Sequence, residues 1–179
     1  MSPRPEWDIR LQAIASRLGI PDWRWLDALI NNESSWDPVA MNPGSSAKGL
    51  IQFIDSTART LGFTDSYDLI TQYADVTTQL EGPVFNYLNK FKPFPTMQSL
   101  YLAVFYPAAR TWDPLKPFPD SVQQANPGIT TPQDYVSMVN RRAGLAGAVN
   151  VSKQWGLPVL LLIGGLIWMI MDRKARKYE

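Results

Sequence analysis

The sequence contains neither cysteine nor histidine. Without these residues the chain cannot form disulfides, thiolate nucleophiles, zinc sites of the usual type or a Ser-His-Asp triad. A chain without cysteine suits either side of a membrane, so its redox compartment stays open. Any acid or base catalysis would have to come from Asp, Glu, Lys or Tyr. Only four glutamates are available, namely Glu6, Glu33, Glu81 and Glu179.

An excess of charge of one sign is also lacking, because 17 Lys and Arg face 16 Asp and Glu. Basic residues form a block only at the extreme C-terminus, whereas phosphate binding requires clustered Lys and Arg. We therefore expect no nucleic acid as the main partner. Apolar residues make up 45% of the 179 residues. A length of 179 residues is enough for one domain of about 150 residues and an appendage, and this apolar content is enough for a packed core.

Strand-like alternation of useful length is absent, and the apolar periodicity is helical. One helix face runs from Trp7 to Leu18, and Asp22 is the expected N-cap of the next helix. The residues between 73 and 91 are also helical in pattern, with an irregularity at Gly82-Pro83. The sequence thus predicts an all-α fold with helices at 7–18, 22–33, 56–61, 73–91, 97–106 and 132–142. Long loops are expected at 36–49 and 113–132.

Glu33 lies on the apolar stripe of the second predicted helix, in the i, i+3, i+4, i+7 series Leu26, Leu29, Ile30 and Glu33. Burial of a carboxylate disfavours its charged form and raises its pKa. A carboxylic acid that is still protonated near neutral pH is what glycosidic cleavage needs. The following loop offers backbone donors, and the Gln52 amide could hold a sugar acetamido or hydroxyl group. The alternative is an N-cap or surface glutamate with no catalytic role.

Several motifs in this region resemble the lytic transglycosylase domain. They are Glu33-Ser34-Ser35-Trp36-Asp37-Pro38, Ala40, Ser46-Ala47-Lys48-Gly49-Leu50-Ile51-Gln52-Phe53 and Ser56-Thr57-Ala58. Two later segments are similar more loosely. The segment 102–109 has the family's tyrosine at Tyr106, with Pro107 and Ala109 in place of an asparagine and a glycine. Asp134-Tyr135-Val136 is similar to the late Tyr-Val segment, and the resemblance runs from about Trp7 to Arg142.

The resemblance implies a lysozyme-like α-helical fold and peptidoglycan glycan strands as substrate. Family enzymes cleave the MurNAc–GlcNAc β-1,4 bond with one glutamate, here Glu33. This residue protonates the leaving oxygen and then, as base, activates the C6 hydroxyl of the same MurNAc, which gives a 1,6-anhydro product. The reaction requires no metal and no cofactor. The expected substrate-binding residues are Ser34, Gln52, Tyr106 and Tyr135.

Alternatives stay open for these residues. A lysozyme-type hydrolase would need a second carboxylate, for which Asp27 and Asp37 are the nearest candidates. Ser34 could orient Glu33 or satisfy carbonyls at the helix end. The tyrosines could bind substrate or only pack, and the aromatic residues Trp23, Trp25, Phe105 and Trp112 favour a core role over sugar platforms. An inactive structural protein with this fold is the competing class, favoured by Pro107 and Ala109.

The C-terminal part predicts a membrane anchor. Residues 1–142 form the expected domain and 143–154 a linker. The stretch Trp155–Met171 carries no charge and would extend about 25 Å as a helix, which is the short end of a membrane span. A basic tail, 172–179, follows. The alternative for Trp155–Met171 is a buried core helix.

Topology and context follow from the basic residues and the N-terminus. Four basic residues after the span and three before it favour a cytoplasmic C-terminus and a periplasmic domain. The polar segment Met1–Trp7 predicts no signal peptide. A wall enzyme of this design suits a phage particle, and the Phe-Tyr-Pro-Ala-Ala variant at 105–109 resembles phage members of the family. We expect the virion membrane or the host inner membrane as location, and other virion proteins as further partners; a host-encoded or lysis-stage enzyme is the alternative.

Overall fold

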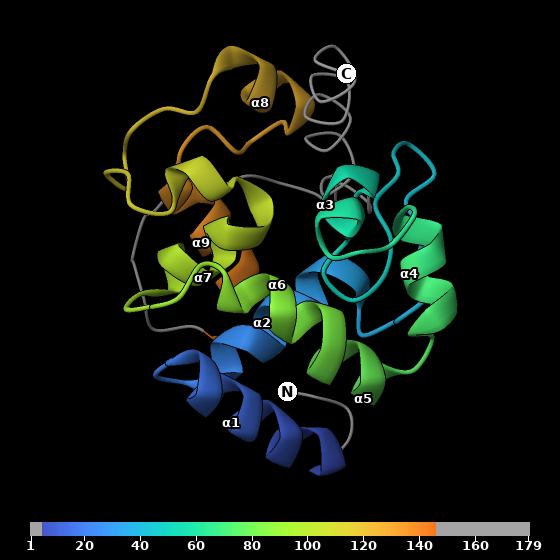
Figure 1. Cartoon of the computed structure of the whole chain (residues 1–179). Helices are drawn as coiled ribbons and strands as arrows, with labels where there is room; N and C mark the ends of the chain where they lie inside the picture. Colours follow the sequence, from blue (N-terminus) through green and yellow to red (C-terminus); the bar gives the residue numbers. More distant parts are fainter. Residues whose placement is uncertain (1–4, 146–179) are drawn as a thin grey trace.

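The structure is a computed structural model that describes residues 5–145. Within this range the chain folds into helices joined by loops, and β-structure is limited to the isolated bridges Met41–Lys48 and Lys48–Phe53. A π-helical turn, Leu80–Val84, joins α5 to α6, and a 3-10 turn, Pro107–Ala109, follows α7. The α-helices (Figure 1) are α1 (Pro5–Leu18), α2 (Trp23–Ser34), α3 (Asp55–Thr60), α4 (Ser66–Gln72), α5 (Val76–Gln79), α6 (Phe85–Asn89), α7 (Met97–Phe105), α8 (Asp120–Ala125) and α9 (Pro132–Arg142). The all-α class is confirmed for the described residues.

Helix α2 begins where the sequence predicted, because the Asp22 carboxylate accepts a hydrogen bond from the Arg24 N–H. Its apolar face is fully enclosed, with Leu26, Leu29 and Ile30 each 0% exposed. Helix α2 packs against α1, α7 and α9. This arrangement fixes the last turn of α2, which carries Glu33, inside the fold.

Helix α7 is the buried centre of the domain, and all its residues from Ser99 to Phe105 are buried. A capping box between Thr96 and Ser99 fixes its start. Helix α9 also begins with a capping box, formed by Thr131 and Asp134, and packs on both α2 and α7. In Figure 1 the three helices α2, α7 and α9 lie together in the middle of the molecule. Residues from chain positions near 33 and 135 are thereby brought side by side.

Two short helices were missed by the sequence expectations. Helix α4 lies in a segment where none was expected, and its start is capped by the Asp65 carboxylate. Helix α8 lies within the expected loop 113–132 and buries Val122 and Ala125. Each of these helices is under two turns long, too short to show an apolar period. The helix expected at 73–91 spans 76–89 as α5, the π-helical turn and α6, and the irregularity expected at Gly82-Pro83 is confirmed, because proline cannot donate to the helical ladder.

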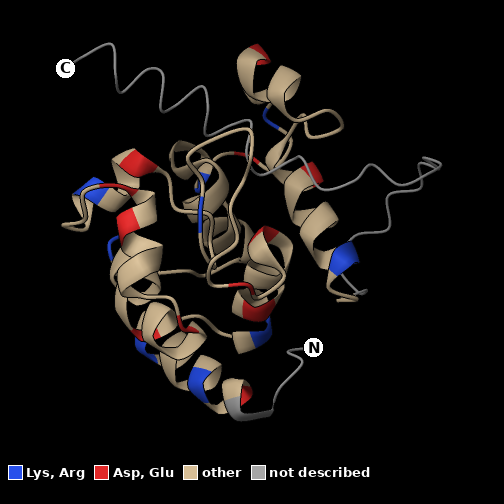
Figure 2. Cartoon of the chain, turned by 90° about the vertical axis from the view of Figure 1, so that its right-hand side faces the viewer, with Lys and Arg blue, Asp and Glu red and all other residues tan. Residues whose placement is uncertain are grey.

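Positions of both charge signs are distributed along the ribbon of the described part (Figure 2). Among residues 5–145 we find no helix whose length and apolarity would let it cross a membrane. The linker beyond Leu145, the anchor Trp155–Met171 and the basic tail 172–179 lie outside the described residues. These parts of the domain scheme stay predictions.

Candidate active site

Glu33 stands in the last turn of α2, at the point where the chain changes direction. The two residues that follow the helix, Ser35 and Trp36, have positive φ angles of 53° and 68°. The turn is held by the Trp36 ring, which stacks on Trp7 at 5.1 Å between centroids and donates its Nε1–H to Asp27 Oδ1 at 3.0 Å. The helix therefore ends abruptly and leaves Glu33 half-buried at its terminus.

Two donors meet on one oxygen of the Glu33 carboxyl group. The Tyr135 hydroxyl donates to Oε1 at 2.6 Å and the Asn32 side-chain amide donates to the same atom at 3.1 Å. Burial raises the pKa of Glu33, while Tyr135, Asn32 and the charge of Arg142 act to lower it. The net direction is upward, so burial dominates, and the carboxyl group holds its proton at a higher pH than a free glutamate does.

Tyr135 is placed by packing. Its ring is 1% exposed and stacks on Phe105 of α7 at 3.9 Å with an angle of 16°. It lies in the first turn of α9, whose start is fixed by the Thr131 and Asp134 capping box. The pKa of Tyr135 is raised by burial and then by the charge of Glu33, so its hydroxyl stays protonated and donates. Phe105 is therefore a core residue that supports the site, which is the packing role that the sequence favoured.

The loop after α2 is held by a residue that the sequence did not single out, Gln79. Its side chain is 0% exposed, and its Oε1 accepts the Leu50 N–H at 2.6 Å. Its amide nitrogen donates to the carbonyls of Pro38 and Tyr73, at 2.9 and 2.7 Å. One buried amide thus joins the two ends of the loop to α5. No local signal in the sequence marks this residue, because its partners lie up to 41 positions away.

Ser34 connects this loop to the helix that carries Glu33. Its hydroxyl lies 3.0 Å from the Leu50 carbonyl and 3.3 Å from the Ile30 carbonyl, both acceptors. The expectation that Ser34 satisfies carbonyls at the helix end is met by these contacts. Among the described residues no hydrogen bond joins the Ser34 side chain to Glu33. Ser34 can therefore orient Glu33 only through the backbone.

Gln52 and Tyr106 occupy different surroundings. Gln52 is 5% exposed, has a φ of 53°, and donates its amide nitrogen to the Gly49 carbonyl at 3.0 Å. Tyr106 ends α7 and packs its partly exposed ring edge-on against Trp112 and Phe118, at 5.8 and 5.7 Å. Among the described residues no hydrogen bond joins either side chain to Glu33. The substrate-binding roles of both residues stay predictions.

The two candidates for a second carboxylate have structural partners. Asp27 is 6% exposed, and the Trp36 indole donates to it. Burial raises the pKa of Asp27. Asp37 is exposed, and its Oδ1 accepts the Val39 N–H at 2.9 Å in a turn. In the described part of the chain, no three acidic side chains are grouped closely enough to hold a metal ion.

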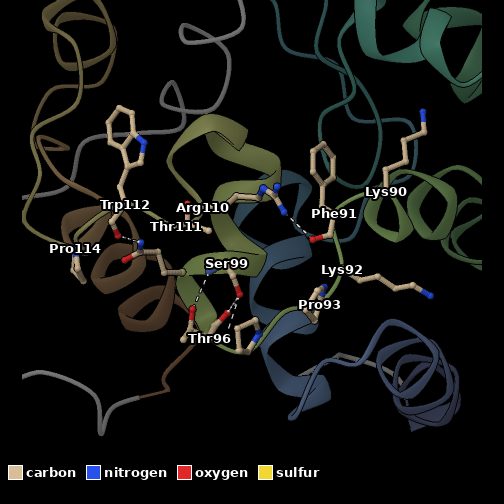
Figure 3. A pocket seen from close by; sticks show the side chains of 12 residues that line it. Lys90, Phe91, Lys92, Pro93, Thr96, Ser99, Arg110, Thr111, Trp112 and Pro114 are labelled. Carbon is tan, nitrogen blue, oxygen red and sulfur yellow. Dashed lines mark hydrogen bonds between the residues drawn. The ribbon is translucent and has the colours of Figure 1, made fainter.

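A cavity of about 700 Å³ lies elsewhere, between residues 90–99 and 110–114 (Figure 3). Arg110 in its wall points to the backbone of Phe91, donating to that carbonyl at 2.7 Å, and covers the Phe91 ring at 4.7 Å. Lys90 donates to the Thr60 carbonyl at 3.2 Å. These two cations are engaged by the protein itself, so they give no indication of a ligand in the cavity.

Two further residues of the site were missed at the level of sequence. Asn32 directly precedes Glu33, and Arg142 in the last turn of α9 donates to Asn32 Oδ1 at 2.8 Å. The position of Asn32 beside the candidate acid was a usable signal. Arg142 is 110 residues away and had none.

Comparison with known proteins gives three findings. Residues 12–86 match the family model described as the transglycosylase SLT domain. The chain is similar to membrane-bound lytic murein transglycosylase F of Alcanivorax borkumensis, with 47% identity over 47 residues. Proteins of the same name from Salmonella typhi and Citrobacter koseri are 45% identical over 47 residues. No solved structure gives a significant match.

These similarities are partial. The aligned stretch covers 26% of this chain, and 10% of the Alcanivorax and Salmonella typhi proteins and 9% of the Citrobacter protein. The chain thus spans about a tenth of the length of these curated relatives. Glu33, Ser34 and Gln52 fall within the matched range, whereas Tyr106 and Tyr135 lie beyond it. Residues 12–86 are therefore similar to a transglycosylase SLT domain, and Glu33 lies within this range in the last turn of α2.

Proposed function

We propose that this protein is a peptidoglycan lytic transglycosylase that cleaves the MurNAc–GlcNAc β-1,4 bond with Glu33 as both acid and base. One observation carries the proposal. Within the matched range 12–86, Glu33 combines a pKa raised by burial with two hydrogen-bond donors on one carboxyl oxygen. A group of this kind holds its proton at a higher pH than a free glutamate does and is also stabilised after releasing it.

The proposed reaction has two proton transfers and needs no water. Protonated Glu33 gives its proton to the glycosidic oxygen while the bond from that oxygen to C1 of MurNAc breaks. The carboxylate formed is stabilised by the Tyr135 hydroxyl and the Asn32 amide, which already point at Oε1. Glu33 then takes the proton of the C6 hydroxyl group, while the oxygen of that hydroxyl group bonds to C1 of the same MurNAc. The enzyme is returned to its starting protonation state, and the product carries a 1,6-anhydro ring.

Supporting roles are proposed for the other residues. Ser34 keeps the end of α2 at a fixed distance from the loop through the Leu50 carbonyl. Gln52 sits in that loop, and its backbone and amide are candidates for sugar contacts. Tyr106 presents a partly exposed ring next to Trp112. The asparagine that family members place after this tyrosine is Pro107 here, so sugar contacts of that kind must come from other groups.

The test is the Glu33→Gln variant, assayed on purified peptidoglycan by zymogram and by release of soluble muropeptides. Glutamine keeps the size of the side chain and removes the proton. Loss of the acid should reduce the rate by about 10²–10⁴-fold or more. Glu81→Gln is the matched control, because Glu81 is exposed and pairs with Arg10 at 2.6 Å. Activity of Glu33→Gln within about tenfold of the wild type would remove Glu33 as the catalyst.

Mass spectrometry of the products distinguishes the chemical routes. Muropeptides that end in 1,6-anhydroMurNAc are expected from the wild-type protein. Products with only reducing-end MurNAc would mean that water is the nucleophile and that the protein is a lysozyme-type hydrolase. A folded wild-type protein without any wall cleavage would place it with structural proteins that keep this fold.

We further propose that Trp155–Met171 anchors the protein in a membrane and that the protein is a phage virion component for local wall penetration. Support for the anchor comes from the uncharged stretch Trp155–Met171, which has Lys153 before it and Asp172 and Arg173 after it. A Leu162→Arg change should cost about 3 kcal/mol of insertion free energy and move the full-length protein to the aqueous phase of a detergent extraction. An aqueous wild type would contradict the anchor, and absence from purified particles would contradict the virion role.

A further inference from the structure

A chain of side-chain hydrogen bonds leads from the end of α9 to the carboxyl group of Glu33. Arg142 donates from its guanidinium to Asn32 Oδ1 at 2.8 Å, and Asn32 donates from its amide nitrogen to Glu33 Oε1 at 3.1 Å. The chain joins the last turns of two helices that are 110 residues apart in sequence. The proposed reaction requires Glu33 but does not by itself require Arg142.

The chain fixes the direction of the Asn32 amide. A free asparagine can present either its oxygen or its NH₂ group to a neighbour, whereas an arginine has only donors. Because Arg142 donates to the oxygen of Asn32, the NH₂ group must turn to the other side, where Glu33 lies. Without this cation, Asn32 could present its oxygen to the carboxylate, and the two acceptors would repel each other.

We propose that Arg142 is a positioning residue that acts through Asn32 to hold the Glu33 carboxylate in one reactive orientation. The inference rests on the proposed transglycosylase function. Both hydrogen bonds of the carboxyl group, from Tyr135 and from Asn32, reach Oε1. This leaves Oε2 as the atom that exchanges the proton with the sugar.

Other charged groups near α2 are engaged elsewhere. On α1, Arg10 pairs with Glu81 and Arg17 lies over the Phe85 ring. In the loop, the Lys48 ammonium donates to the Ser46 carbonyl and the Ser66 hydroxyl.

Titratable groups that are buried on the three helices around the site are Asp27 of α2, Tyr101 of α7 and Tyr135 of α9. Trp36 donates to Asp27, Tyr101 donates to Asn140, and Tyr135 donates to Glu33 itself. Arg142 is thus the cation that acts on the pKa of Glu33 among the described residues, in the downward direction.

The expected size of the effect is modest. Arg142 is exposed, so water screens its charge and the direct attraction to Glu33 is weak. The larger part of the effect of Arg142 on the rate comes from the orientation of the Asn32 amide, which contributes one net hydrogen bond to the Glu33 carboxylate. Losing one such bond corresponds to about a two- to tenfold fall in rate.

The experiment compares Arg142→Gln, Arg142→Lys, Asn32→Ala and the double variant Asn32→Ala/Arg142→Gln. Arg141→Gln is the control, because Arg141 is an exposed neighbour in the same basic last turn of α9 and its loss changes the net charge equally. The readouts are kcat and KM across pH on a soluble glycan substrate and the titration of the Glu33 carboxyl carbon by NMR. Thermal unfolding of each variant checks that it is folded.

We expect Arg142→Gln and Asn32→Ala each to lower kcat by about two- to tenfold with KM nearly unchanged. Both changes remove stabilisation of the carboxylate, so the pKa of Glu33 rises and the alkaline limb of the pH profile moves to higher pH. The double variant should be no worse than Asn32→Ala alone, because Arg142 acts through Asn32. Arg142→Lys should recover part of the loss, since lysine keeps the charge and a donor.

Two outcomes would overturn the proposal. One is a loss of kcat in the double variant that equals the product of the two single losses, and the other is the same kcat and pH profile for Arg142→Gln and Arg141→Gln. The NMR titration separates it from the proposed function, because it requires no substrate. If Arg142→Gln moves the Glu33 titration but the wild type cleaves no peptidoglycan, the proposed function fails and the positioning role stands. If the wild type is active and Arg142→Gln leaves the titration unmoved, the positioning role fails alone.

Discussion

The buried amide of Gln79 should be costly to remove, because three backbone groups depend on it. We consider Gln79→Leu, which keeps the approximate volume but has no polar atom. The change leaves the Leu50 N–H and the carbonyls of Pro38 and Tyr73 without their partner. Leu50 is 0% exposed, so its N–H cannot turn to water.

The magnitude follows from the three groups. A buried polar group without a partner costs about 1–3 kcal/mol. Counting the Leu50 N–H in full and the two partly exposed carbonyls at the lower end gives about 3–5 kcal/mol. Domains of this size have a free energy of unfolding of roughly 5–15 kcal/mol, so the loss is a large part of the total. The melting temperature should fall by about 10–15 °C.

Urea unfolding at neutral pH measures this loss, and Gln72→Leu is the control. Gln72 is an exposed helical glutamine whose amide donates only to Asp68 at 2.9 Å, so its replacement should change the free energy of unfolding by less than about 0.5 kcal/mol. At temperatures below the melting transition, the wall-cleaving activity of Gln79→Leu should be about tenfold lower than that of the wild type. The reason is that the Leu50 carbonyl that Ser34 contacts belongs to the same loop. A Gln79→Leu protein within about 1 kcal/mol of the wild type would refute the reasoning.

Three further predictions concern the same region. Gly49→Ala should cost about 2–3 kcal/mol of unfolding free energy, because the φ of Gly49 is +78° and a Cβ would lie 2.6 Å from the Gln79 amide oxygen. Gly62→Ala is the control for the backbone part of this cost, because Gly62 has a φ of +96° and a Cβ there would meet no atom within 4 Å. Tyr135→Phe keeps the stacking on Phe105 but removes the 2.6 Å bond to Glu33, so kcat should fall about 10- to 100-fold and the alkaline limb of the pH profile should move to higher pH; an unmoved limb would contradict the assignment. The stability of Glu33→Gln relative to the wild type should increase as pH rises from the unfolded-state pKa of Glu33 through its raised folded-state pKa. Between these two values the native wild type binds more protons than the unfolded chain, so the wild type loses stability with rising pH. A difference in unfolding free energy that stays constant from pH 4 to pH 8 in urea titrations would refute this.

The sequence by itself determined the elements that depend on near neighbours. The apolar spacing from Leu26 to Glu33 is a property of one helix, and the structure buries it as expected. The Asp22 cap and Pro132 in the first turn of α9 were also readable, because capping involves residues within one turn. The candidate acid could be named for the same reason, since its position on the apolar stripe and its motif are both local.

Short helices and long-range partners were beyond the reach of local patterns. Helices α4 and α8 have six or seven residues, and tertiary contacts rather than periodicity stabilise segments of that length. Only the packing of α9 against α2 and α7 brings the Tyr135 hydroxyl to Glu33 across 102 residues and Arg142 to Asn32 across 110. Likewise, the fold decides that Gln79 meets Leu50 and Pro38. The sequence thus supplied the carboxyl group, and the tertiary structure decided which donors surround it, because hydrogen bonds between distant residues depend on how all the helices pack together.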